Sequence, residues 1–214
     1  ALFTPGYADE MDGQSRSYTM STANVSLLDD LVATTNALAT LLNDQMAELA
    51  DTLTTISSGV QRYEMDGNNT INTEDDYIDL YDFARLVQLH VDDADIQTAA
   101  QAVMDAVDDF VTTERHGSEG DWELDNSHGV SIFFPSTASS FYSESNYDFA
   151  VGATWSGDSI SSLQLSAESP ISWGPMLVSF FETTQPGGPD DPTPPEPLPR
   201  SRMHVYLPII FRNY

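Results

Sequence analysis

The sequence contains no cysteine and no lysine. Without cysteine, the chain forms no disulfide, offers no thiolate to a metal ion and has no cysteine nucleophile of its own. Its 34 acidic residues outweigh 7 basic ones, all of them arginine, and give a net charge of -27. A surface this acidic repels phosphate backbones and anionic lipid, so we expect no nucleic-acid partner and favour cations or basic peptides as ligands.

Long hydrophobic runs are also missing. No apolar run approaches the ~18 residues that a membrane-crossing helix needs, so the sequence predicts no membrane span. Strong negative charge keeps a surface solvated, which is typical of secreted proteins and of proteins from salty environments. The charge does not separate these two origins, and we expect a secreted or cell-surface location.

The composition divides the chain into four segments. Residues 1–20 are rich in glycine, proline and aspartate, and predict an irregular lead-in. Residues 21–185 carry the regular hydrophobic patterns. Residues 186–199 form a proline-rich linker, and residues 200–214 are basic and apolar, which predicts an extended C-terminal strand.

Hydrophobic periodicity predicts several helices. Leucines and other apolar residues recur at three- and four-residue steps from Val25 to Ile56, so we expect one long amphipathic helix, with Ser26 and Asp29 as a capping box. A helical hairpin follows: its first helix has Asp79 as N-cap, and its second ends at about Thr113.

The same pattern predicts a last short helix or packed segment over Trp173–Phe181. The segments 61–76 and 114–127 are polar and are expected to be loops, and 136–145 is expected to be a surface connection.

One strand organises these elements. Gly129-Val-Ser-Ile-Phe-Phe-Pro135 is apolar on both faces, which is typical of a strand buried inside a sheet. Few other segments read as strands of comparable strength, so we expect some neighbours of this strand to come from polypeptide outside the chain. The fold class is α+β or α/β.

Several stretches resemble the clostripain family of cysteine peptidases, whose catalytic domain is caspase-like. Tyr77-Ile-Asp-Leu-Tyr-Asp-Phe-Ala84 is similar to an Asp-Leu-Tyr-Asp-Phe-Ala segment of the family, and Gly129–Pro135 is similar to its Gly-Val-Ser-Ile-Tyr-Phe-Pro strand. The stretch that starts at Tyr18, together with Tyr147–Ala150, extends the resemblance over about residues 18–155.

The resemblance implies which part of such a peptidase this chain would be. In the family, the catalytic histidine and cysteine precede the matched region, and members can be cut into two chains. The chain would therefore be the heavy-chain-like C-terminal part of a caspase-like α/β/α fold in a secreted, proteolytically processed endopeptidase. Its partner would be the N-terminal catalytic chain of the same precursor, which would supply the nucleophile that this chain lacks.

His128 is the histidine most suggestive of catalysis. Ser127-His128-Gly129 resembles the way in which caspase-like peptidases present a general base. It directly precedes the organising strand, however, downstream of the place where the resemblance puts both catalytic residues. We therefore expect a hydrogen-bonded loop histidine.

Two acidic segments are candidates for calcium, which the resemblance also associates with activity. The candidate ligands are Asp66, Asn68, Glu74, Asp121, Glu123 and Asp125. The first segment is dense in side-chain oxygens but departs from the EF-hand pattern at Ile71 and Tyr77, and the second alternates carboxylates along the chain. Solvated acidic loops are the alternative.

The C-terminal strand is the candidate partner-binding segment. Its apolar residues are Val205, Tyr206, Leu207, Ile209, Ile210 and Phe211. Such a strand can add to a sheet edge of its own molecule or of another copy, which would allow homo-assembly. It also resembles the ends of secreted bacterial proteins and could serve as a surface-sorting tag, or it could simply pack on the body. The alternative function is therefore an extracellular structural or surface-assembly subunit.

Overall fold

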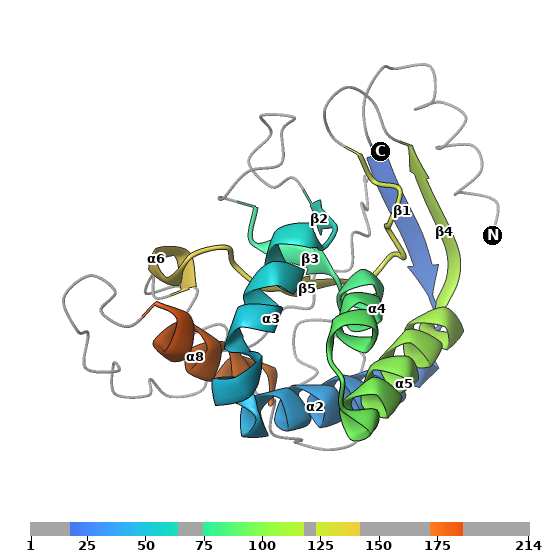
Figure 1. The fold of residues 1–214 in the computed structure, drawn as a ribbon. Helices are drawn as coiled ribbons and strands as arrows, with labels where there is room; N and C mark the ends of the chain where they lie inside the picture. Colours follow the sequence, from blue (N-terminus) through green and yellow to red (C-terminus); the bar gives the residue numbers. More distant parts are fainter. Residues whose placement is uncertain (1–17, 64–74, 118–122, 142–171, 186–214) are drawn as a thin grey trace, which may run out of the picture.

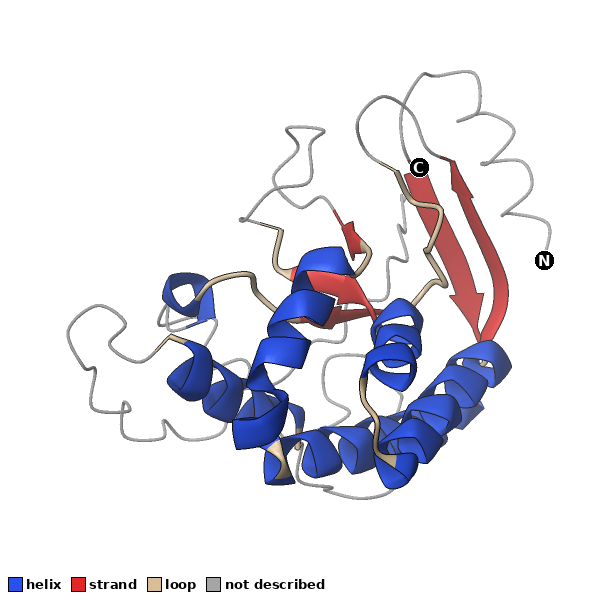
Figure 2. Ribbon diagram, viewed as in Figure 1, coloured by secondary structure: helices blue, strands red, loops and turns tan. Residues whose placement is uncertain are grey.

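The structure is a computed structural model that describes residues 18–63, 75–117, 123–141 and 172–185. It is a mixed α+β fold in which helices pack around a small antiparallel sheet, and a second, two-stranded antiparallel sheet extends from the end of α5 (Figures 1 and 2). The antiparallel pairing favours the α+β alternative of the sequence prediction.

The first sheet is a two-stranded ribbon. Strand β1 (Tyr18–Ala23) pairs with β4 (Val111–Gly117), which follows it by about ninety residues. Both strands correct the sequence prediction: β1 begins inside the expected irregular lead-in, residues 1–20, and β4 occupies the start of the expected loop 114–127. Neither strand alternates apolar and polar residues clearly, because much of the ribbon is only partly buried.

The second sheet lies at the centre of the molecule and has the order β2-β3-β5 (Figure 1). It consists of β2 (Arg62–Tyr63), β3 (Tyr77–Asp79) and β5 (Ser131–Phe133). The organising strand is therefore shorter than Gly129–Pro135, although Val130 and Phe134 on either side of it are also buried. One neighbour of β5 is β3 of the same chain, with Ile78 opposite Ile132.

The expected long helix is interrupted. A 3-10 turn, η1 (Val25–Leu27), leads into α2 (Leu28–Asp44), and α3 (Met46–Gly59) follows after Gln45, whose φ of -112° and ψ of 17° are not helical. The break lets α2 pack on α5 and α8 while α3 turns to pack on α4 and α8. A hydrophobic period that continues across Gln45 does not reveal such a change of direction.

The expected capping box at the start of this region is wrong. Asn24 is the cap of η1, and its side-chain oxygen accepts hydrogen bonds from the backbone N–H and the hydroxyl of Ser26. Ser26 itself lies inside η1, and the cap position of α2 is Leu27, which makes no side-chain cap hydrogen bond.

The helical hairpin is confirmed. It consists of α4 (Leu80–His90) and α5 (Ala94–Phe110). Asp79 caps α4 as predicted, and Asp93 caps α5 by accepting hydrogen bonds from the N–H groups of Asp95 and Ile96. The second helix ends at Phe110 rather than near Thr113, because the chain turns there into β4.

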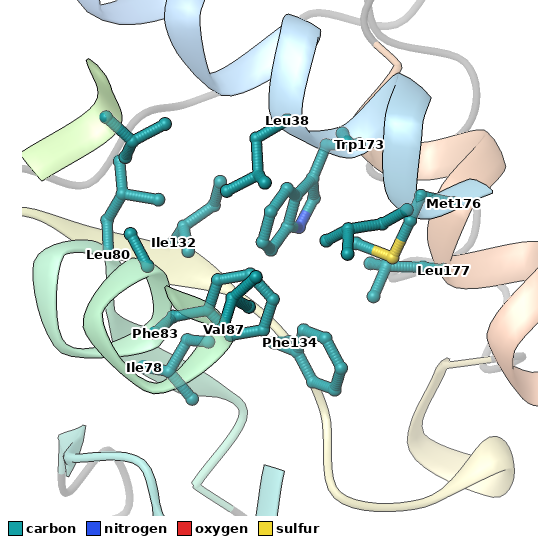
Figure 3. Packing of buried hydrophobic residues seen from close by; sticks show 14 of the residues in the cluster. Leu38, Ile78, Leu80, Phe83, Val87, Ile132, Phe134, Trp173, Met176 and Leu177 are labelled. Atoms are coloured by element: carbon teal, nitrogen blue, oxygen red, sulfur yellow. The ribbon is translucent and has the colours of Figure 1, made fainter. Parts of the chain in front are cut away.

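A continuous hydrophobic core joins the helices to the central sheet. Trp173 and Phe83 are both almost fully buried, and their rings pack edge-to-face against each other, with centroids 5.3 Å apart (Figure 3). Trp173 opens α8 (Trp173–Thr184), which confirms the predicted last helix. The expected surface connection after Pro135 instead contains a short helix, α6 (Ala138–Phe141), whose two end residues are buried because they extend this core.

One helical segment, Val25–Asp44, is long and apolar enough to cross a membrane when judged by length and composition alone. A core helix passes the same test, and the buried residues of α2 contact α5 and α8. The absence of a membrane span therefore stays a prediction.

Candidate functional site

In the described part of the chain, a buried polar cluster is centred on the carboxylate of Asp79. This residue ends β3, caps α4 and has no exposed surface. Its Oδ1 accepts a hydrogen bond from the backbone N–H of Asp82 at 2.8 Å. Its Oδ2 accepts two more, from the hydroxyl of Tyr63 and from the backbone N–H of His128, each at 2.7 Å. A buried carboxylate needs such donors to offset the loss of water.

The hydroxyl of Tyr63 continues the cluster towards the ribbon. It lies 3.0 Å from the hydroxyl of Ser127, which lies 3.2 Å from the hydroxyl of Thr19 in β1. Burial raises the pKa of Tyr63 well above its ordinary value, and the charge of Asp79 raises it further. Tyr63 is therefore a neutral phenol that donates to Asp79 and accepts from Ser127.

His128 lies at the edge of this cluster, with its side chain about one third exposed. Its ring stacks on that of Tyr81, with centroids 3.9 Å apart, and its Nδ1 lies 2.9 Å from the carbonyl oxygen of Asn126. The same Nδ1 lies 3.4 Å from Oδ1 of Asp79. Burial lowers the pKa of His128, but the hydrogen bond and the charge of Asp79, together with the Asn126 carbonyl, raise it above the ordinary histidine value.

Asp82 and Gln61 hold two backbone segments in place, one directly before β2 and one that begins at Glu123. The buried Asp82 accepts a 2.8 Å hydrogen bond from the N–H of Gln61 and pairs at 2.7 Å with Arg85, which is partly exposed. The side-chain amide of Gln61 donates to the carbonyl of Glu123 at 2.9 Å. The segment 123–130 is therefore attached to the central sheet at both of its ends.

Arg62 forms a second polar centre at the other end of the sheet. Its Nη1 donates to the carbonyl oxygens of Asp75 and Phe134, at 2.8 Å and 2.9 Å, and its Nη2 donates to the carbonyl and the hydroxyl of Ser57. Burial lowers the pKa of Arg62, and the negative charges of Asp76 and Asp75, which directly precede β3, oppose that shift. The guanidinium stays charged and joins three separate backbone segments.

A groove of about 720 Å³ lies between α3 and α8, beside Arg62. Glu48 and Asp51 of α3 line it together with Phe180 and Thr183 of α8. All of the donor groups named above for Arg62 are engaged in the protein's own contacts, so the arginine holds the wall of the groove together.

The cluster around Asp79 fixes the backbone of Asp82 and His128 and does not present a nucleophile to a substrate. The hydroxyl of Ser127 is almost fully buried and bonds to Tyr63 and Thr19, not to the imidazole of His128. A hydrolase triad requires a serine that bonds to its histidine and faces the substrate, so this set is not one. His128 is a hydrogen-bonded loop histidine, in the position that the sequence prediction assigned to it.

The predicted calcium ligands are only partly described. Glu123 and Asp125 are exposed, whereas Asp66, Asn68, Glu74 and Asp121 lie outside the described residues. Within the described ranges, no group of three or more acidic or histidine side chains could hold a metal ion. A calcium site stays a prediction.

The linker and the C-terminal strand, residues 186–214, also lie outside the described residues. This range includes all six predicted partner-binding residues, Val205, Tyr206, Leu207, Ile209, Ile210 and Phe211. Partner binding by the C-terminal strand therefore stays a prediction.

The sequence predicted the local roles of two members of the Asp79 cluster, Asp79 as a helix cap and His128 as a hydrogen-bonded loop histidine. Asp79 was recognisable as a helix cap, with Asp82 three positions later. Tyr63 and Ser127 were missed, because they lie 16 and 48 positions away from Asp79 and 64 positions from each other.

Comparisons with known proteins give no match. No family model, no curated protein and no solved structure matches the chain.

Proposed function

We propose that the chain is the non-nucleophilic C-terminal portion of a secreted, clostripain-like cysteine endopeptidase. In this proposal, the chain completes a caspase-like α/β/α domain, and an upstream catalytic chain of the same precursor supplies the histidine and the cysteine. The resemblance of three separate segments to that family is the starting point, and the absence of cysteine from the chain requires the nucleophile to lie elsewhere.

One structural observation supports the proposal most directly. The two segments that most resemble the family, Tyr77–Ala84 and Gly129–Pro135, lie side by side although about fifty residues separate them. They pair through β3 and β5, with Tyr77 opposite Phe133. The N–H of Leu80 also donates a 2.9 Å hydrogen bond to the carbonyl oxygen of Val130. Segments that carry one family pattern are expected to meet when that pattern describes one structural unit.

The role of this chain in catalysis would be structural and electrostatic. A thiolate of the upstream chain would attack the peptide carbonyl to form an acyl-enzyme, which water would then hydrolyse. The present chain would hold the end of the sheet in place through the Asp79 cluster. Its charge of -27 would attract substrates that carry basic residues.

Denaturing mass spectrometry of the natural material, after labelling with a thiol-reactive peptide that carries arginine, tests this proposal. The expected result is a second, equimolar chain that contains cysteine and carries the label. A complete natural product without cysteine would overturn it. If that product also assembles, and deletion of residues 200–214 abolishes assembly, the alternative of a structural or surface-assembly subunit would be favoured.

A further inference from the structure

The contacts of His128 determine which of its ring nitrogens titrates. Nδ1 faces the carbonyl oxygen of Asn126 at 2.9 Å and Oδ1 of Asp79 at 3.4 Å. A carbonyl oxygen can only accept, and both oxygens of Asp79 already accept hydrogen bonds from N–H or O–H donors. Nδ1 must therefore carry a hydrogen in both charge states, so the proton that comes and goes is the one on Nε2.

The charged groups around this ring favour its protonated form. Asp79 from β3 and Asp82 from α4 are the charged groups that act on His128 directly. The charged groups that act on its neighbours are Asp105 and Asp108 from α5 and Arg85 from α4, around Tyr81, and Glu114 from β4, near Tyr63. Carboxylates dominate this set. Arg85, the one cation among them, is paired with Asp82. A positive charge on His128 is therefore stabilised.

His128 also connects two parts of the fold. Its backbone N–H and its ring both bind Asp79, which belongs to the central sheet and to α4. The residues on either side of it bind the ribbon: Ser127 contacts Thr19, and the carbonyl oxygen of Gly129 accepts a 2.9 Å hydrogen bond from the hydroxyl of Ser21. A change in the contacts between His128 and Asp79 therefore also affects the contacts of Ser127 and Gly129 with β1.

We propose that Asp79 and His128 form a pH-sensitive latch between segment 123–130 and the β3–α4 junction. Protonation of Nε2 adds a positive charge beside the buried carboxylate and tightens the latch. Because segment 123–130 also holds β1, the β1–β4 ribbon is fastened more firmly to the central sheet in mildly acidic solution. The latch lies entirely within this chain, so it is independent of any upstream catalytic chain.

The direction of the effect follows from linkage. An ordinary histidine has a pKa of about 6.5, and that of His128 is raised in the folded chain. The stabilisation from the charged form is fully present below about 6.5 and is lost as the pH rises through the folded-state pKa. Each unit by which the pKa is raised corresponds to about a tenfold change in the equilibrium for opening the latch.

Two measurements on the intact 214-residue chain test the latch. The first is an NMR titration of the His128 ring, which should show a pKa above about 6.5 and a hydrogen that stays on Nδ1 throughout. The second is the hydrogen-exchange protection of the His128 amide, corrected for the intrinsic rate at each pH. Protection should fall as the pH rises through that pKa.

Variants separate the latch from general stability. Asp79→Asn should return the His128 pKa towards the ordinary value and remove the pH dependence of amide protection. His90→Gln, at the exposed end of α4, is the matched control and should change neither. The proposal is overturned if His128 in the unmodified chain titrates at or below about 6.5, or if its amide protection is independent of pH. The measurements on the unmodified chain decide the matter even if Asp79→Asn does not fold.

Discussion

The indole N–H of Trp173 donates a 2.7 Å hydrogen bond to the carbonyl oxygen of Phe133 and so joins α8 to β5 across 40 positions of sequence. The ring of Trp173 also packs edge-on against that of Phe134, with centroids 6.1 Å apart. The side chain of Trp173 therefore contacts both the backbone of the central sheet and the aromatic core that packs against it. Trp173 thus attaches the start of the last helix to the central sheet, while the other buried residues of α8 pack against α2 and α3.

Trp173→Phe should destabilise the chain by about 1–3 kcal/mol, because it removes a buried hydrogen bond and leaves space in the core. Urea unfolding followed by circular dichroism would measure this loss. Leu89→Ala, which truncates a side chain that is 67% exposed, is the control and should change stability by less than about 0.5 kcal/mol. Equal effects of the two substitutions would contradict the assigned role of Trp173.

Gly129 occupies a position that other residues cannot take without strain. Its φ is +86°, and a Cβ added to it would lie 2.7 Å from Cβ of Ser21. Gly129→Ala should therefore cost about 2–4 kcal/mol in urea unfolding, through left-handed strain and a clash with β1. Gly59→Ala, where a Cβ meets nothing within 4 Å, should be neutral or stabilising. A neutral Gly129→Ala would show that β1 is not packed against segment 123–130.

Asp79 and Asp93 cap neighbouring helices in different environments, and they form a matched pair. Asp79→Asn should destabilise the chain by about 1–3 kcal/mol, because an amide cannot accept all the hydrogen bonds that converge on this buried carboxylate. Asp93→Asn should have a much smaller effect, since Asp93 is only partly buried and asparagine caps a helix almost equally well. Guanidinium unfolding of both variants at neutral pH would compare them. Similar losses would mean that capping, not burial, accounts for the role of Asp79.

Arg62 should not tolerate replacement by lysine. Its guanidinium donates hydrogen bonds in two directions, to Phe134 and Asp75 on one side and to Ser57 on the other, and an ammonium group cannot reproduce that fork. We expect Arg62→Lys to cost about 2–3 kcal/mol of unfolding free energy. Arg115→Lys, on the exposed ribbon, is the control and should cost close to nothing. The prediction fails if thermal unfolding shows the same melting temperature for both variants.

The helices were the part of the fold that the sequence predicted well. The hairpin α4–α5 follows from an aspartate at each cap position and from apolar residues at helical spacing, and α8 follows from its apolar residues alone. The break at Gln45 could not be predicted in this way. The apolar period runs through it, and the reason for the break is the packing of α2 and α3 on different neighbours.

The strands and the polar cluster were predicted poorly, for a related reason. Strand β4 has a polar sequence, and it is a strand because β1, about ninety residues earlier in the chain, pairs with it. In the same way, Ser127 and Tyr63 carry no local sign that they meet at Asp79. Their positions depend on the pairing of β2, β3 and β5.

The sequence by itself determined the acidic, cysteine-free character of the chain, its amphipathic helices and the buried organising strand, because composition and periodicity are local properties. Only the tertiary structure decided that β3 and β5 would pair and enclose the carboxylate of Asp79. A buried carboxylate is tolerated only where several donors converge on it, and those donors come from segments far apart in sequence. Their convergence is a property of the folded chain.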